Sequence, residues 1–102
     1  SLDLEDVYGS IDIETQRTGI ELENIRRLDG DINIVTTRGS IEVELDRGSD
    51  FELDCRAESG RIYVDFDSVD IEERGSYANR FGTGGFRVTL RSSGGSVSLD
   101  ES

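Results

Sequence analysis

The carboxylates are the side chains of this sequence with the widest range of available chemistry. Eight of them occupy polar positions beside apolar residues: Asp12, Glu14, Glu21, Glu23, Glu42, Glu44, Glu52 and Asp54. If the segments that carry them stack in register, like charges would lie about 4.8 Å apart. This arrangement is unfavourable unless arginines or a divalent cation such as Ca²⁺ offset it. The pattern favours a solvated acidic face that opposes aggregation.

The densest run of oxygen ligands lies at residues 65–70. Its weak candidates for a metal site are Asp65, Asp67 and Asp70. The run lacks the Gly and the distal Glu of an EF-hand loop, and it lacks the Gly-Gly-x-Gly-x-Asp pattern of calcium-binding rolls. The sequence therefore predicts no metal site and no cofactor, with Ca²⁺ as the weaker alternative.

The residues needed for catalysis are largely missing. The chain contains no His, so Ser-His-Asp and Cys-His sites are excluded within it. Its one cysteine, Cys55, follows Leu53 at strand spacing and is predicted to be a buried core residue rather than a reactive thiol. The glycine-rich stretch 82–85 introduces an alternating segment and predicts a tight turn rather than a phosphate loop. We expect no enzyme.

Three aromatic residues are candidates for binding a partner. Tyr63 stands at a polar position between Ile62 and Val64, whereas Tyr77 and Phe81 lie in a stretch without regular alternation. Exposed aromatic side chains stack on sugars or anchor protein interfaces. The alternative is that this stretch folds back and its aromatic side chains close the end of the core. The partner is an unknown protein or a glycan.

The net charge of −12 narrows the classes of partner. It arises from 23 acidic and 11 basic residues, and all the basic residues are arginines. Such a surface repels nucleic acid and anionic lipid, so neither is expected to bind. Lysine-free acidity is compatible with a halophilic source and equally with biased codon usage. No run approaches the roughly 18 apolar residues of a membrane span, so no direct membrane insertion is expected.

One repeated pattern accounts for most of the chain. A Gly, usually followed by one spacer, precedes an apolar-polar-apolar triplet, and triplets begin at positions 2, 11, 20, 32, 41, 51, 62, 88 and 97. Strict alternation is typical of strands with one buried face, and no segment has a sustained helical period. The predicted core consists of Ile11, Ile13, Ile20, Leu22, Ile32, Ile34, Ile41, Val43, Phe51, Leu53, Ile62, Val64, Val88, Leu90, Val97 and Leu99.

The similarity between the repeats favours a short solenoid over a β-sandwich, which stays open as the alternative. Residues 9–13 and 39–43 are near copies, Gly-Ser-Ile-Asp-Ile and Gly-Ser-Ile-Glu-Val. Coils that stack on one another need such likeness, whereas the strands of a sandwich do not. Between positions 62 and 88 the rhythm breaks: residues 69–74 could form one more strand, and residues 75–84 are predicted to be a loop.

The iterated Gly-Ser/Asp-Ile-x-Ile/Val units, with the closing phrase at residues 82–99, resemble the bacterial adhesin-like superfamily of repetitive β-domains. The resemblance covers nearly the whole chain. It implies a right-handed, single-stranded β-helix-like stack in an exported or membrane-attached protein, and it brings no catalytic residues. It also implies that this chain, being short for the family, lacks N-terminal coils.

Together these observations predict one repetitive β-domain over residues 1–102, excised from a longer protein. Its expected function is that of a non-catalytic bacterial cell-surface or envelope module that binds a partner. The alternatives are, in order, a structural spacer that self-associates end to end and an enzyme acting on envelope polysaccharide through paired carboxylates. An extracytoplasmic location through a signal or anchor outside this fragment is expected, although a cytoplasmic one is also compatible with the sequence.

Overall fold

The structure, a computed structural model, describes residues 2–5, 10–17, 19–25, 30–46, 50–66, 69–82 and 84–101. Most of the described residues belong to strands and none to a helix, which confirms the all-β prediction. The strands are β1 (Leu2–Glu5), β2 (Ile11–Thr15), β3 (Ile20–Ile25), β4 (Ile32–Thr36), β5 (Ile41–Leu45), β6 (Phe51–Phe66), β7 (Val69–Phe81), β8 (Phe86–Ser92) and β9 (Val97–Glu101).

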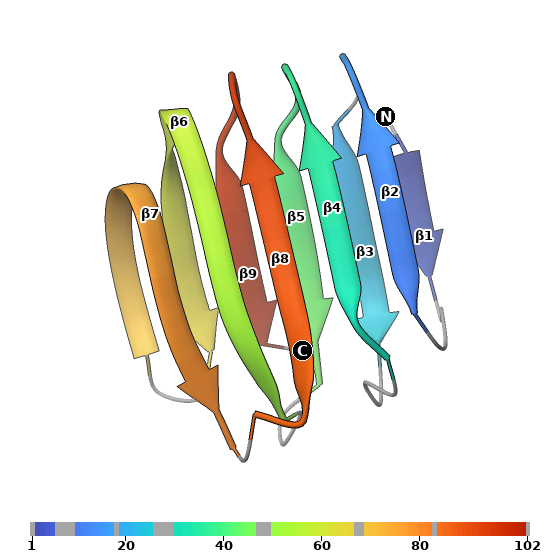
Figure 1. Cartoon of the computed structure of the whole chain (residues 1–102), viewed down its shortest axis with the longest axis vertical. Coiled ribbons are helices and arrows are strands. Elements are labelled where there is room, and N and C mark those ends of the chain that lie inside the picture. The colour runs from blue at the N-terminus through green and yellow to red at the C-terminus, as the bar shows by residue number, and fades with distance from the viewer. Residues whose placement is uncertain are drawn as a thin grey trace.

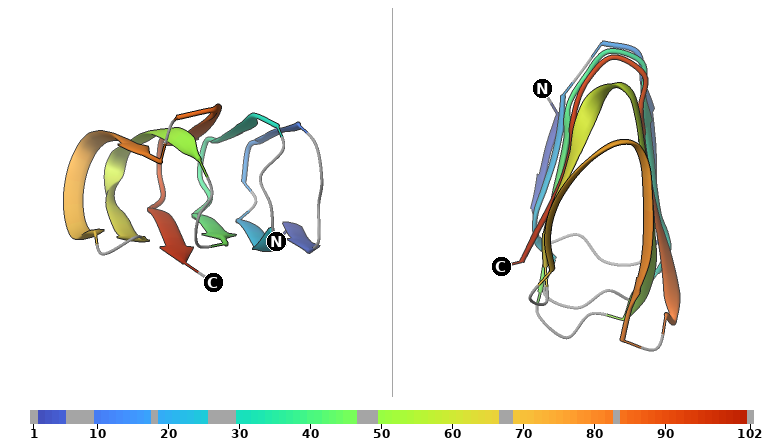
Figure 2. Two further views of the ribbon diagram at one scale, coloured as in Figure 1. Left: turned by 90° about the horizontal axis from the view of Figure 1, so that it is seen from below. Right: turned by 90° about the vertical axis from the view of Figure 1, so that its left-hand side faces the viewer.

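All nine strands belong to one sheet, which is curled into a half-barrel (Figures 1 and 2). The strand order is β1-β3-β5-β9-β6-β8-β4-β2, and β7 pairs with β6 outside this path. All pairs are parallel except β6 with β7. A β-sandwich needs two sheets packed face to face. The structure has a single sheet, so the alternative of a β-sandwich is wrong. The finer description as a solenoid stays a prediction.

The sheet curls because the strands are grouped into arches. An arch is two short strands joined by a tight turn at one edge of the molecule, as in β2–β3, β4–β5 and β8–β9. The long strand β6 forms an arch by itself, since its first half pairs with β8 and its second half with β9. Viewed along the stack of arches, the two rows of strands converge at the turns, here called the apex, and spread apart at the opposite, wide edge (Figure 2).

The order of the arches in space differs from their order in the sequence. The last arch, β8–β9, lies between β4–β5 and β6, so the chain passes over one position after β5 and fills it at the end (Figure 1). The strand β7 then covers β6 on its far side and runs antiparallel to it. A stack built in simple chain order would show neither feature.

Apolar residues from both rows face each other inside the arches. Of the sixteen predicted core residues, fifteen are buried, and Ile13 is partly buried against them. The register explains this agreement, because apolar positions pair across neighbouring arches, as Ile32 does with Val88 and Ile41 with Val97. The structure also confirms that Cys55 is buried, and it adds Leu45, Ala57, Phe66 and Phe81 to the core.

The predicted loop at residues 75–84 is mostly strand, which corrects that expectation. Residues 75–81 belong to β7 and pair with the first half of β6, so that Tyr77 lies opposite Cys55 and Phe81 opposite Phe51. The predicted glycine turn follows: Gly82 and Gly84 have φ angles of 65° and 71°. These left-handed conformations suit glycine. The strand β7 was difficult to predict because burial alternates only near its two ends, and residues 72–76 between them are all exposed.

The apex is filled by small residues. The Ser92 hydroxyl is buried, donates a hydrogen bond of 2.7 Å to the carbonyl of Gly39 and accepts one of 2.9 Å from the amide of Gly95. Thr36 of β4 and Ala57 of β6 occupy the equivalent positions in the neighbouring arches, because each of them pairs with Ser92 in the register. The hydroxyls of Thr15 and Thr36 are joined by a hydrogen bond of 3.0 Å. Hydroxyl ladders therefore satisfy the polar groups where the arches are narrowest.

Candidate functional site

The two rows of strands expose outer faces of different charge. The outward side chains of β8, of the first half of β6 and of the second half of β7 include four arginines, which define the arginine face: Arg56, Arg80, Arg87 and Arg91. The opposite row exposes eight carboxylates, which define the acidic face: Glu21, Glu23, Glu42, Glu44, Asp65, Asp70, Glu72 and Asp100. Alternation along the strands produces both faces, since each polar side chain follows a buried one.

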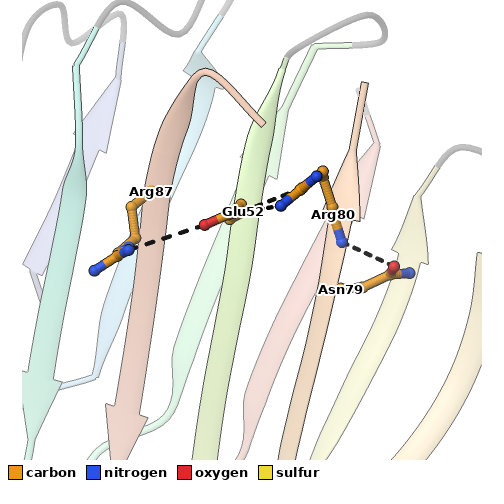
Figure 3. A network of polar contacts seen from close by, with 4 residues as sticks. All are labelled: Glu52, Asn79, Arg80 and Arg87. Carbon is orange, nitrogen blue, oxygen red and sulfur yellow. Dashed lines mark hydrogen bonds and ion pairs between the residues drawn. The ribbon is translucent and has the colours of Figure 1, made fainter. Parts of the chain in front are cut away.

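One end of the arginine face is an exposed ion-pair network around Glu52 (Figure 3). Arg80 donates from Nε and from a terminal nitrogen to one Glu52 oxygen at 3.2 and 2.8 Å. A terminal nitrogen of Arg87 lies 3.9 Å from the other oxygen. Because Glu52 is shared by two guanidinium groups that are 66% and 71% exposed, the network keeps a net positive charge towards solvent.

At the other end, two arginines lie directly opposite each other on neighbouring parallel strands. Arg56 of β6 is in register with Arg91 of β8, and both side chains are exposed. Among the described residues no ion pair joins either of them to a carboxylate. Like charges in this position destabilise a sheet, so the pair is a feature that folding alone does not account for.

Three shallow hollows follow β8 along the arginine face. The largest, about 670 Å³, is lined by Glu52, Leu53, Asp54, Ala78, Asn79, Arg80 and Arg87. The second, about 420 Å³, lies between β4 and β8 and shares Arg87 with the first. The third, about 130 Å³, lies towards the apex, shares Arg91 with the second and includes Arg56. The hollows form a chain along the surface rather than a deep cleft.

The acidic face places carboxylates side by side across four strands. Glu44 pairs with Asp100, Asp100 with Asp65, and Asp65 with Asp70. Partial burial, and then the charges of Asp65, Glu42 and Glu44, raise the pKa of Asp100 above its ordinary value. At the apex end of this face, Arg61 forms an exposed ion pair of 2.7 Å with Glu72, and this partner lowers the pKa of the Glu72 carboxyl.

We expect Asp100→Asn to stabilise the protein at neutral pH by less than about 1 kcal/mol, because the group is largely exposed. A carboxyl whose pKa is raised on folding costs stability when ionised, and this cost disappears as the pH falls through the folded-state value. The gain should therefore be present at pH 7 and vanish below about pH 4. Urea unfolding at both pH values tests this. Glu14→Gln, on the other row, controls for the general loss of charge; an equal gain there would contradict the expectation.

The predicted metal candidates are only partly described. Asp65 and Asp70 are directly paired and exposed, whereas Asp67 lies outside the described residues. No group of three or more His, Cys, Asp or Glu side chains in the described ranges could hold a metal ion. A calcium site at 65–70 therefore gains no support from these residues.

The three aromatic candidates have different surroundings. Tyr63 is 41% exposed on the acidic face, between Ser98 and Glu72 in the register. Tyr77 is partly buried, packs against the core and accepts a hydrogen bond of 2.9 Å from Asn79. Phe81 is a core residue, only 4% exposed, and its ring packs against Phe51 and Phe66. The low exposure of Phe81 corrects the expectation that its side chain is exposed. It agrees with the alternative, in which the stretch folds back and closes the end of the core.

The buried thiol of Cys55 is predicted to be inert in the folded protein. Burial and the neighbouring Asp54 raise the pKa of Cys55 to about 12, so almost no thiolate exists at pH 8. A thiol reagent should then label Cys55 only as fast as the protein opens, and labelling should become immediate in denaturant. Fast, complete labelling of the folded protein at pH 8 would contradict the assignment of Cys55 as a core residue.

The arginine face is the feature that sequence reasoning missed. Of the described arginines, Arg17, Arg38 and Arg61 lie near the apex. The available signal was the strand spacing, since Arg56, Arg87 and Arg91 alternate with buried residues. Their proximity depends on β8 lying beside β6, which the sequence order does not indicate.

Comparison with known proteins found no match: no family model, no curated protein and no solved structure matches the chain. In the described part of the chain no helix is long and apolar enough to cross a membrane. Any functional assignment must therefore come from the two faces themselves.

Proposed function

We propose that this chain is a non-catalytic binding module, and that its ligand docks on the arginine face. The observation that supports this most is the juxtaposition of Arg56 and Arg91 without an ion-paired carboxylate, in a protein whose net charge is −12. Asp54 lies on the same face and Glu58 lines the same hollow, yet neither forms an ion pair with Arg56 or Arg91. Like-charge contacts that cost stability are typical of sites that a ligand completes.

We propose that the scaffold is a short, solenoid-like stack of arches, as in the adhesin-like β-domains that the sequence resembles. The in-register pairing of apolar residues across arches and the shared apex residues support this reading. The inserted β8–β9 arch and the reversed β7 are departures that the family pattern does not include. A rigid stack suits a binding role because it fixes side chains at regular spacing on one face.

The same features support placing the module at the bacterial cell surface or envelope, and they argue against an enzyme. The hollows are shallow, and the carboxylates of the acidic face lie on regular exposed strands. A glycosidase pair would need a cleft that surrounds the scissile bond. Asp100, whose pKa is raised on that face, lines none of the three hollows.

The test is a binding screen with matched single variants. The wild-type protein is applied to arrays of neutral glycans, acidic glycans and proteins, together with Arg91→Glu and Arg74→Glu. Both variants reverse one exposed arginine, but Arg74 lies at the edge of the acidic face, opposite Arg61. We expect bound ligands that Arg91→Glu loses and Arg74→Glu keeps. Ligands that are indifferent to Arg91→Glu, or no ligand at all, would contradict the proposal.

One observation favours a second function, that of a self-assembling structural element. In the described residues β7 is hydrogen-bonded to β6 alone, so its other edge is available to a further strand. Light scattering after size-exclusion chromatography, over a wide range of concentration, separates the two functions. A constant mass near 11.3 kDa supports the binding module, and growth to larger species supports assembly.

A further inference from the structure

We propose that two copies of this chain form a closed, two-fold symmetric dimer by pairing their β7 strands antiparallel, with Gly75 of each copy at the symmetry axis. This inference rests on the second function proposed above, self-assembly, and names its partner, its register and its size. It depends on three properties of β7: its free edge, the position of its bend, and the order of its side chains on either side of that bend.

The strand β7 ends the sheet with a long edge. It contains 13 residues, whereas strands in globular proteins usually have about 5–6. Among the described residues it pairs with β6 alone, and it follows the arch of β6 at the end of the stack (Figures 1 and 2). Short length and proline are two means by which proteins keep an edge strand from pairing, and β7 has neither. Charges are a third means, but those of β7 are of both signs.

The inner side of this edge leaves apolar side chains incompletely covered. Val69, Ile71 and Tyr77 pack against the core but are only partly buried, because in the described structure no arch lies beyond β7. Inside the stack, by contrast, apolar residues are covered by the arches on both sides, as Leu53 and Val88 are. A further arch stacked on β7 would remove this apolar surface from water, which favours association.

The bend of the arch determines the register of the partner strand. Gly75, with a φ angle of 86°, lies opposite Ala57, and Arg74 lies opposite Arg61, so β7 and β6 bend at the same place. Arches stack when their bends coincide, and a shift by one residue would turn every apolar side chain to the wrong face. An antiparallel copy of β7 therefore places its own Gly75 opposite this one. Two identical strands that pair in this way are related by a two-fold axis.

In this register complementary side chains meet across the axis. Asp70 and Arg80 lie five residues before and five residues after Gly75, so each copy's Asp70 faces the Arg80 of the other. Both side chains are exposed in the single chain, and opposite charges on facing strands stabilise a sheet. On the inner face Val69 meets Phe81, six residues on either side of Gly75. The two-fold axis produces each of these contacts twice.

The other end of the stack gives a second copy no such complementarity. The strand β2 is last in the strand order, and its exposed side chains are the carboxylates Asp12 and Glu14. Two β2 edges would therefore bring like charges together, which destabilises a sheet. The two-fold contact also uses the β7 edge of both copies at once, so no β7 edge is left for a third copy. We expect assembly to stop at the dimer.

The experiment is light scattering after size-exclusion chromatography, with the protein at about 1 μM to about 1 mM. The wild type should rise from 11.3 kDa to twice that mass and no further. Asp70→Arg and Arg80→Asp should each weaken the dimer at least about tenfold, because each variant places like charges opposite each other at two positions. The double variant Asp70→Arg/Arg80→Asp should regain an affinity within about threefold of the wild type, because both contacts re-form with their signs exchanged.

Two control variants make the same charge changes one strand away from β7 or further. Asp65→Arg reverses the residue of β6 that pairs with Asp70, and Arg87→Asp reverses the other arginine that shares Glu52 with Arg80. Both side chains are exposed and neither lies on β7, so each change should alter the affinity by less than about twofold. Thermal melting shows whether the variants fold. If Arg80→Asp melts without cooperativity, Asp70→Arg and its control Asp65→Arg decide the test.

The outcomes separate this inference from the function on which it rests. Equal weakening by Asp70→Arg and Asp65→Arg, or a folded double variant that stays monomeric, would overturn the register and with it the proposal. Growth beyond twice the mass of the chain would overturn the closed dimer and keep self-assembly. A constant mass of 11.3 kDa at every concentration would overturn both, and binding at the arginine face would still be decided by its own screen.

Discussion

Replacing Gly95 with Ala should unfold the protein or lower its free energy of unfolding by about 3 kcal/mol, whereas Gly19→Ala should leave stability nearly unchanged. Both glycines belong to the turns that join the strands of an arch at the apex, in β8–β9 and β2–β3 respectively. Neither has a positive φ angle among the described glycines, so the difference does not come from backbone conformation. It comes from the space above each residue.

At Gly95 that space is already occupied by the neighbouring arch. A Cβ atom there would lie 2.2 Å from the carbonyl oxygen of Gly39 and 2.6 Å from its carbonyl carbon. At Gly19 the corresponding nearest atom is the carbonyl oxygen of Ser40, at 3.7 Å, which is an ordinary contact. The obstacle at Gly95 is backbone and cannot rotate away, so the two arches would have to separate.

Separation of these arches would also break polar contacts that hold the apex together. The Gly95 amide donates to the Ser92 hydroxyl, which donates in turn to the Gly39 carbonyl. The amide of Ile41 donates to the carbonyl of Ser96 at 2.9 Å. Each of these buried or partly buried groups would lose a partner, at a cost of about 1–3 kcal/mol for a fully buried one.

Urea unfolding of the wild type and both variants tests the prediction. Gly60→Ala provides a second case, because its Cβ would lie 2.3 Å from the carbonyl oxygen of Gly95. If Gly95→Ala unfolds at the same urea concentration as the wild type, the close stacking of the arches at the apex is wrong. A loss for Gly19→Ala as large as that for Gly95→Ala would instead implicate backbone conformation.

These glycines show how far the sequence could be interpreted. Their repetition before most apolar triplets is typical of turns, and turns join the strands of β4–β5 and β8–β9. The physical reason for glycine at position 95 was not visible, because it is the proximity of Gly39, 56 residues away in the sequence. A one-dimensional pattern identifies where the chain turns, but not which turns lie on one another.

The order of the arches was unpredictable for a related reason. The repeats resemble one another, so nothing local indicates that β8–β9 lies between β4–β5 and β6 rather than at the end of the stack. Alternation predicted the core residues well because burial depends on which face a residue occupies, and any order of arches preserves that face. The candidate site did not share this advantage, since Arg56 and Arg91 meet only through the inserted arch.

The acidic face could be predicted from the sequence only in part. Alternation alone placed Glu21, Glu42 and Glu44 on the outside, and the structure confirms that these side chains are not buried. Their separation from the arginines depends on the arches as well, because each arch contributes one strand to each row. The charge asymmetry of the two faces is therefore a property of the fold that composition does not reveal.

Phe81→Ala should also be strongly destabilising, with a loss of about 3–5 kcal/mol in the free energy of unfolding. The ring is 4% exposed and completes a cluster with Phe51 and Phe66, which lie at the two ends of β6. Its centroid lies 5.0 Å from that of Phe51, in a stacked arrangement, and 5.1 Å from that of Phe66, edge to face. These separations and orientations are those in which aromatic pairs attract each other beyond simple burial.

Phe81 matters because of what it attaches. It is the last residue of β7 and pairs with Phe51 at the start of β6, so it anchors the reversed strand to the stack. The middle of β7 contributes no buried side chain, since residues from Glu72 to Ser76 are all exposed. Loss of the ring would leave β7 held by its hydrogen bonds to β6 and by the partly buried Val69, Ile71 and Tyr77, and would leave a cavity beside Phe51 and Phe66.

Tyr63→Ala is the matched control, because it removes an aromatic ring from β6 that is 41% exposed and points away from the core. Surface replacements of this kind change stability by about 0.5 kcal/mol or less. For a domain of about 100 residues the loss at Phe81 corresponds to a fall of more than about 12 °C in melting temperature. If Phe81→Ala melts close to the wild type while losing affinity for a ligand, Phe81 is a contact residue and β7 does not close the core. If its melting temperature falls as expected, the stretch that interrupts the repeat is the cap of the stack.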